Sequence, residues 1–140
     1  MKHPKILLVI TDKQCTDAIS AYKRYFNDLP YCAHHLHTPN IGRLIGNGYS
    51  FILSNSENPL SGSSRGCMFT GRYTIENDIN YNNVGIDKTI PILGQWLTDN
   101  SDYKCFYCGK WHAGGAWHYS KVEGNRRIPG FTTIPISEYP

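Results

Sequence analysis

Three separated segments carry the side chains in this sequence that are best suited to chemistry. Asp12 follows an apolar run, Ser61 opens a serine-rich stretch that ends in Arg65, and Lys110 and His112 follow a second apolar run. A serine hydroxyl needs an adjacent base, a lowered pKa or a metal ion before it attacks. Cationic groups stabilise negative charge that develops during a reaction. Each segment alone is ordinary, so a site depends on whether the fold brings them together.

The predicted strands would place these side chains at one edge of a sheet. Residues 5–11 form a continuous apolar stretch with β-branched residues, which is typical of a buried parallel strand. Residues 49–53 and 105–108 are the other predicted strands. Ligands of open α/β sheets bind at the carboxyl ends of the strands. Asp12 and Lys110 would both lie at such an end.

Helices are predicted between these strands. Apolar spacing indicates a helix over residues 16–26, and Thr38-Pro39-Asn40 indicates the start of another, which Gly48 would stop. Further helices are predicted over residues 65–69 and from about residue 89. Alternation of strands and helices predicts a parallel sheet with right-handed crossovers. The Gly- and Pro-rich sequence after His112 shows no periodic element, so it is expected to be irregular.

Composition indicates one globular domain. The 140 residues are 40% hydrophobic and 18% charged. Fourteen Lys+Arg against 11 Asp+Glu give a net charge of +3, which does not favour nucleic acid or a membrane surface as a partner. The longest apolar run, residues 6–10, is too short for a membrane span or a signal-peptide core. A cytoplasmic location and reduced cysteines are the default expectations.

Four motifs, in order, resemble the N-terminal part of the sulfatase family, within the alkaline-phosphatase-like superfamily. KILLVITDKQ, from Lys5, resembles the opening strand and metal-binding turn, and HTPNIGRLIGNGYSF, from His37, resembles the TPN segment. SGSSRGCMFTGRY, from Ser61, resembles the C/S-x-P-S-R signature with its Thr-Gly-Arg end, and CGKWHAG, from Cys108, resembles GKWHxG. The resemblance spans nearly the whole chain.

The resemblance implies an α/β, alkaline-phosphatase-like sandwich. This chain would be its N-terminal fragment, with a mainly parallel sheet and flanking helices. Residues 1–140 would form the N-terminal portion of a sulfatase catalytic domain, without the C-terminal half that supplies further metal ligands. The 140 residues by themselves are therefore expected to be inactive.

The resemblance also assigns roles to the candidate residues. Ser61 would be oxidised to formylglycine, and Asp12 and Ser61 would ligate Ca²⁺ or Mg²⁺. Arg65 would hold the formylglycine hydrate, Lys110 would bind the sulfate, and His112 would hydrogen-bond the hydrate. The substrate would be a small-molecule or carbohydrate sulfate ester. A serine at this position implies a formylglycine-generating enzyme of the radical, anaerobic type as a partner.

Two departures from the family pattern leave alternatives open. Lys13 stands where the family usually has a second aspartate, and Ser63 stands where the signature commonly has proline or alanine. Ser61 could instead act unmodified, as the nucleophile of a phosphatase-type or phosphodiesterase-type hydrolase. The chain could also be a truncated, catalytically inactive sulfatase-like protein.

Two cysteine-containing clusters suggest metal sites but are set aside. Cys105 and Cys108 lie three apart on a predicted strand, so their sulfurs would point to opposite faces. A second cluster, Cys32, His34, His35 and His37, precedes the TPN segment and is interpreted as a solvated loop. Cys67, six residues past Ser61, is interpreted as a packing residue of a helix.

Overall fold

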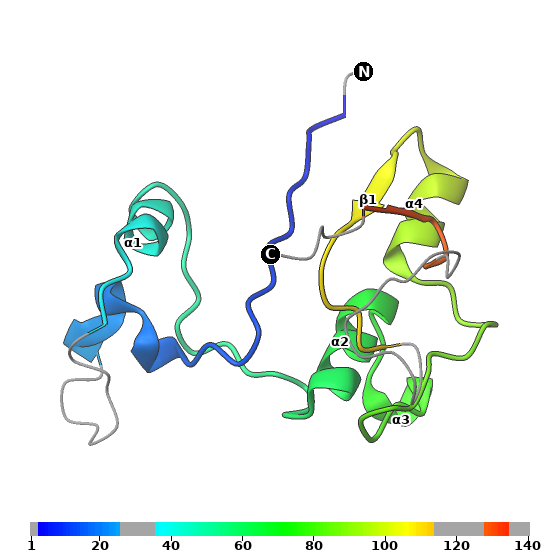
Figure 1. The fold of residues 1–140 in the computed structure, drawn as a ribbon, viewed down its shortest axis with the longest axis horizontal. Coiled ribbons are helices and arrows are strands. Elements are labelled where there is room, and N and C mark those ends of the chain that lie inside the picture. Colours follow the sequence, from blue (N-terminus) through cyan, green and yellow to red (C-terminus); the bar gives the residue numbers. More distant parts are fainter. Residues whose placement is uncertain (1–2, 26–35, 114–127, 135–140) are drawn as a thin grey trace, which may run out of the picture. The chain divides into compact units, whose positions relative to one another are not determined.

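The computed structural model describes residues 3–25, 36–113 and 128–134 (Figure 1). The chain divides into two units, which are described separately. The smaller unit is Lys5–Asn55, and the larger unit joins Met1–Pro4 to Ser56–Pro140. Within the described residues, no helix is both long enough and apolar enough to cross a membrane.

The described part of the smaller unit has two short 3₁₀ helices and one α-helix, η1 (Thr16–Ala18), η2 (Ser20–Tyr25) and α1 (Pro39–Gly46). Pro39 opens α1, as predicted. The Thr38 side chain does not cap this helix, because its Oγ1 accepts a hydrogen bond from the Ser20 N–H at 2.9 Å. The Ser20 hydroxyl in turn accepts from the Thr38 N–H at 3.1 Å, which ties η2 to the start of α1.

Two predictions for the smaller unit are wrong and one is right in part. Residues 5–11 and 49–53 are not assigned to any strand. The apolar side chains of the first segment are 57–87% exposed from Ile6 to Val9. A strand is held by backbone hydrogen bonds to a neighbour, and apolar content does not supply one. The predicted helix over residues 16–26 is present as η1 and η2 up to Tyr25.

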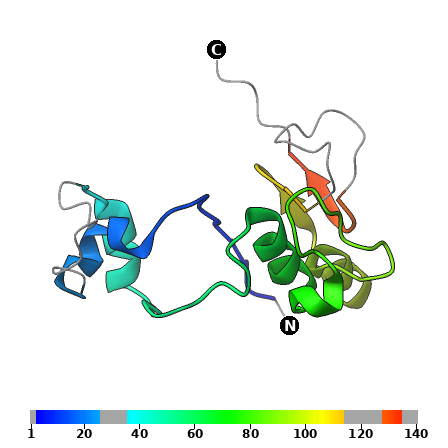
Figure 2. The same ribbon diagram turned by 90° about the horizontal axis from the view of Figure 1, so that it is seen from below.

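Within its described residues, the larger unit contains three α-helices and two strands, α2 (Ser61–Thr70), α3 (Thr74–Asn77), α4 (Leu93–Asn100), β1 (Cys105–Tyr107) and β2 (Phe131–Thr133). The strands are parallel, with Cys105 opposite Phe131 and Tyr107 opposite Thr133. α2 packs against α3 and α4, and α4 packs against β1 (Figures 1 and 2). A parallel sheet with flanking helices confirms the predicted α/β class.

β2 corrects the expectation that the sequence after His112 is irregular. The signal for it is short: Pro129-Gly130 followed by the aromatic and β-branched residues Phe131 to Ile134. The pairing extends one residue past the strand, since the Ile134 N–H donates to the Tyr107 carbonyl at 2.8 Å. A three-residue strand is recognisable only once its partner is in place.

An aromatic cluster joins α2 to the sheet and to the turn after β1. Its members are Phe69, Tyr107, Trp111 and Phe131, whose ring centroids lie 4.6–6.4 Å apart in five contacting pairs. Phe69 and the nearby Ile79 are almost completely buried. Packing of this kind fixes the end of β1 relative to α2.

Candidate active site

Ser61 is the first residue of α2, which begins four residues before the predicted start. Two hydrogen bonds fix the residues that lead into α2. Asn58 Oδ1 accepts from the Leu60 N–H at 2.9 Å, and the Leu60 carbonyl accepts from the Ser64 N–H at 2.8 Å. Ser61 therefore lies at the N-terminus of a helix. Such a position favours an anion, because helix N–H groups and the helix dipole face it.

Ser61 is hydrogen-bonded to His112, although 51 residues separate them in sequence. The distance from Ser61 Oγ to His112 Nδ1 is 2.8 Å. His112 is buried, and its φ of 54° lies in the left-handed region that a residue with a side chain rarely adopts. Together with Gly109, at φ 101°, it makes the tight turn after β1. This turn carries the imidazole to the start of α2.

The Arg65 side chain contacts the backbone carbonyl of Lys110. The buried Arg65 lies one helical turn after Ser61, on the same face of α2. Its Nη1 donates to the Lys110 carbonyl at 2.6 Å. The turn after β1 is therefore bonded to α2 at two points, Ser61–His112 and Arg65–Lys110.

Tyr107 is a third member of this contact that the sequence did not reveal. Its hydroxyl donates to the same Lys110 carbonyl, and Arg65 Nη1 lies 3.4 Å from it. Burial raises the pKa of Tyr107 above 10.0, and the Arg65 charge opposes that rise. The only signal in the sequence was its place at the end of β1, just before the GKWH motif.

Asn82 is a second missed residue. Its Oδ1 accepts the N–H of Gly62, the residue after Ser61, at 2.9 Å. No motif marks Asn82, because its role depends on where the loop between α3 and α4 passes.

Ser63, the departure from the signature, is fully buried in the first turn of α2. Its hydroxyl has no hydrogen-bond partner among the described residues. A buried position that offers no hydrogen-bond partner to a hydroxyl suits a small apolar side chain better than serine. Alanine and proline, which the signature commonly has at this position, are such side chains.

Asp12, the predicted metal ligand, belongs to the smaller unit, so the structure does not test its approach to Ser61. No group of three or more His, Cys, Asp or Glu side chains that could hold an ion occurs in the described part of the chain. Ca²⁺ takes six to eight oxygen ligands and Mg²⁺ takes six. The donors described here do not complete such a shell. Most of the Cys32–His37 cluster lies outside the described residues.

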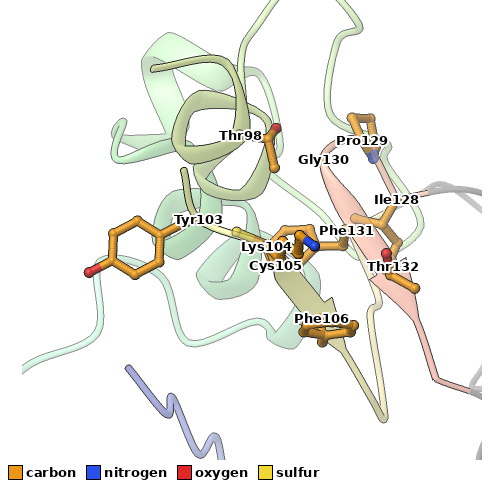
Figure 3. Close-up of a pocket in the computed structure, with 10 residues that line it drawn as sticks. All are labelled: Thr98, Tyr103, Lys104, Cys105, Phe106, Ile128, Pro129, Gly130, Phe131 and Thr132. Carbon is orange, nitrogen blue, oxygen red and sulfur yellow. The ribbon is translucent and has the colours of Figure 1, made fainter. Parts of the chain in front are cut away.

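A cavity of about 390 Å³ lies in the larger unit, but away from these residues. It is lined by α4, the start of β1 and the approach to β2, with Thr98, Lys104 and Pro129 on its walls (Figure 3). Ser61, Arg65, Lys110 and His112 do not line it. The candidate active site is therefore defined by hydrogen bonds at the start of α2.

The comparisons with known proteins agree with the motifs. The family model described as Sulfatase matches residues 4–136. A sulfatase of Escherichia coli K12, YidJ, is 32% identical over 88% of this chain and 23% of its own length. An N-acetylglucosamine-6-O-sulfatase of Bacteroides thetaiotaomicron is 32% identical over 79% of this chain and 18% of its own length. The chain thus spans about a fifth of each of these relatives, and no solved structure matches it significantly. The chain belongs to the sulfatase family.

Proposed function

We propose that this chain is the nucleophile-bearing part of a hydrolase of sulfate monoesters, with Ser61 as the residue that becomes formylglycine. The observation that carries the proposal is the 2.8 Å hydrogen bond between Ser61 and His112 at the start of α2. Arg65 lies one turn along the same helix, and the Sulfatase family model matches residues 4–136.

Each residue has a distinct task in this proposal. Formylglycine supplies a hydrated aldehyde, with one hydroxyl to attack sulfur and another to expel sulfate. His112 holds or accepts a proton at Nδ1, the atom that contacts Ser61. Its unusual backbone conformation fixes the direction of the ring, at a cost of about 1–3 kcal/mol that the surrounding packing offsets.

Positive charge stabilises the sulfuryl group. Arg65 is buried and bonded to the Lys110 carbonyl, so its guanidinium is held rigidly beside the first turn of α2. We assign Lys110 to binding the sulfate oxygens. Preorganised cations and helix N–H groups act without reorganisation when negative charge develops, and one such donor contributes about 3–4 kcal/mol in a well-built site.

A divalent ion is part of the family pattern, and Asp12 with Ser61 is the predicted ligand pair for Ca²⁺ or Mg²⁺ in this chain. The described residues do not complete a coordination shell. No step of the reaction is therefore assigned to the ion.

The substrate class and the maturation partner are also proposals. The B. thetaiotaomicron relative acts, by its name, on N-acetylglucosamine 6-O-sulfate. A sulfated carbohydrate is accordingly the first substrate to try. The serine at position 61 supports maturation by a radical, anaerobic formylglycine-generating enzyme. The 140 residues alone are proposed to show no turnover.

The mass of the peptide that contains residue 61 tests this proposal. After co-expression with an anaerobic maturation enzyme, we expect that peptide to lose a pair of hydrogen atoms, and Ser61→Ala to abolish the loss. Cys67→Ala is the matched control, because Cys67 is the one thiol of α2. Retention of the full mass at residue 61, while a known serine-type sulfatase is oxidised in the same cells, would rule out the formylglycine.

The hydrogen bond also favours one alternative. An unmodified Ser61 that donates to an unprotonated His112 Nδ1 is the arrangement of a base-activated nucleophile. A full-mass Ser61 together with release of phosphate from an aryl phosphate, lost in Ser61→Ala, would favour this phosphatase-type reaction.

A further inference from the structure

We propose that Asn82 is a positioning residue that caps α2 from a distant loop and holds Ser61 against His112. The importance of Asn82 for catalysis rests on the proposed function. The contacts that support its positioning role are independent of that function. Asn82 touches neither Ser61 Oγ nor the imidazole in any hydrogen bond of the described structure, so it acts through the backbone.

The first turn of α2 needs an external acceptor. The first N–H groups of a helix have no partner within the helix, and they are usually satisfied by a polar side chain at the N-cap. Here the N-cap is Leu60, whose side chain cannot accept a hydrogen bond. Gly62 is buried, so an unpaired N–H there would be costly. Asn82 supplies the missing acceptor at 2.9 Å.

Gly62 is also the point at which three segments meet. A Cβ atom built on Gly62 would lie 3.2 Å from Asn82 Oδ1, 3.2 Å from the His112 carbonyl oxygen and 3.3 Å from Asn82 Cα. These separations are tighter than ordinary side-chain contacts. Glycine therefore allows the loop of Asn82, the start of α2 and the backbone of His112 to approach one another closely.

The loop that contains Asn82 is also hydrogen-bonded to the backbone next to His112. Four residues after Asn82, the Ile86 N–H donates to the carbonyl of Ala113, the residue after His112, at 3.2 Å. The loop of residues 82–86 thus holds both the turn that carries Ser61 and the turn that carries His112. Loss of the Asn82 bond would let the two catalytic side chains move relative to one another.

Three variants of the whole chain separate this role from a general loss of folding. Asn82→Ala removes the acceptor, Asn82→Asp keeps an acceptor oxygen in the same place, and Asn80→Ala changes an exposed asparagine two positions away. With ¹⁵N-glycine and ¹⁵N-histidine labels, NMR follows hydrogen exchange of the Gly62 N–H and the chemical shift of His112 Nδ1. A Ser61→Ala sample gives the shift of an unbonded Nδ1.

Asn82→Ala should raise the exchange rate of the Gly62 N–H roughly fivefold, the factor that corresponds to a hydrogen bond worth about 1 kcal/mol. It should also move the His112 Nδ1 shift toward its value in Ser61→Ala. Asn82→Asp should restore both signals, and Asn80→Ala should change neither. If Asn82→Ala unfolds the chain, Asn82→Asp with a normal Gly62 exchange rate and a normal His112 Nδ1 shift still supports the proposal, because aspartate keeps the acceptor oxygen of asparagine and lacks its amide N–H groups.

Unchanged exchange and an unchanged Nδ1 shift in Asn82→Ala would overturn the proposal, whatever reaction Ser61 performs. Faster exchange of the Gly62 N–H with an unchanged His112 Nδ1 shift would also overturn the proposal, since Asn82 would then cap α2 without positioning Ser61 against His112. If both signals respond as expected but residue 61 is never oxidised, the proposed function fails and the positioning role stands.

Discussion

At the scale of single residues, one backbone carbonyl of the candidate site binds both an arginine and a tyrosine side chain. The Lys110 oxygen accepts hydrogen bonds from both Arg65 and Tyr107. Two donors on one acceptor hold the arginine of α2 and the end of β1 to the same point. The Tyr107 hydroxyl therefore helps to hold the Arg65 guanidinium beside the backbone of Lys110.

Tyr107→Phe tests this arrangement because it keeps the ring in the aromatic cluster and removes only the hydroxyl. We expect a loss of roughly 1 kcal/mol in the free energy of unfolding near neutral pH. Tyr103→Phe is the matched control, since the Tyr103 hydroxyl also donates to a carbonyl, that of Pro4, outside the site. Urea unfolding measures both, and equal losses would show that the Lys110 contact has no special weight.

The raised pKa of Tyr107 adds a pH dependence with a definite sign. A folded-state pKa above the ordinary 10.0 means that folding favours the protonated phenol. Its contribution is complete below about pH 10 and is lost as the pH rises through the raised pKa. The stability gap between the wild-type chain and Tyr107→Phe should therefore be constant up to about pH 10 and narrow above it, as measured by unfolding at a series of pH values. A gap that stays constant at alkaline pH would contradict the burial of this phenol.

At the scale of elements, the position of β2 depends on a glycine in α4. A Cβ atom built on Gly94 would lie 2.2 Å from Cε2 of Phe131 and 2.4 Å from its Cδ2. A Cβ atom built on Gly130, at φ 73°, would likewise lie 2.1 Å from the backbone nitrogen of Gln95. The first turn of α4 therefore packs directly on the start of β2, with no side chain between them.

Gly94→Ala should destabilise the chain although alanine is the better helix former. The gain in helix propensity is about 1 kcal/mol, whereas overpacking against the half-buried ring of Phe131 costs about 1–3 kcal/mol. We expect a net loss, with faster hydrogen exchange in β2. Gly42→Ala in α1 is the matched control, because its Cβ would meet only Ala21 Cβ, at 3.9 Å, so it should be neutral or stabilising. Stabilisation by Gly94→Ala would mean that α4 and β2 do not pack this closely.

At the scale of the whole molecule, the chain leaves a large amount of apolar surface in contact with water. Ile6, Leu7, Leu8 and Val9 are all more than half exposed, as are Tyr49, Phe51 and Leu53. Contiguous apolar stretches of this kind drive association in water. The isolated chain is therefore expected to self-associate and to bind an apolar dye.

Replacing Leu7 and Val9 by lysine should lower dye binding and sedimentation-measured association without loss of secondary structure, since neither side chain is buried. Ser54→Lys with Asn55→Lys adds the same charge at two exposed polar positions and should leave association nearly unchanged. A wild-type chain that sediments as a monomer and binds no dye would contradict this prediction. An equal effect of both double variants would point to charge alone.

Local signals in the sequence determined the family, the α/β class and much of the helical structure. The resemblance of SGSSR and GKWH to family motifs grouped Ser61, Arg65, Lys110 and His112 as candidate site residues, because such motifs can be read without knowledge of the fold. Pro39 marked the start of α1 because its fixed φ and missing N–H suit the first helical position. β1 was found because an apolar run ends directly before a motif.

Only the tertiary structure decided which backbone groups these residues meet. β2 pairs with β1 across 26 residues, and no three-residue pattern specifies a partner at that separation. Residues 5–11 have the composition of a strand but no assigned partner, and composition cannot provide the missing hydrogen bonds. Asn82 and Tyr107 matter because of one N–H and one carbonyl that lie within reach. Such contacts depend on the path of the chain in space, which side-chain type alone does not encode.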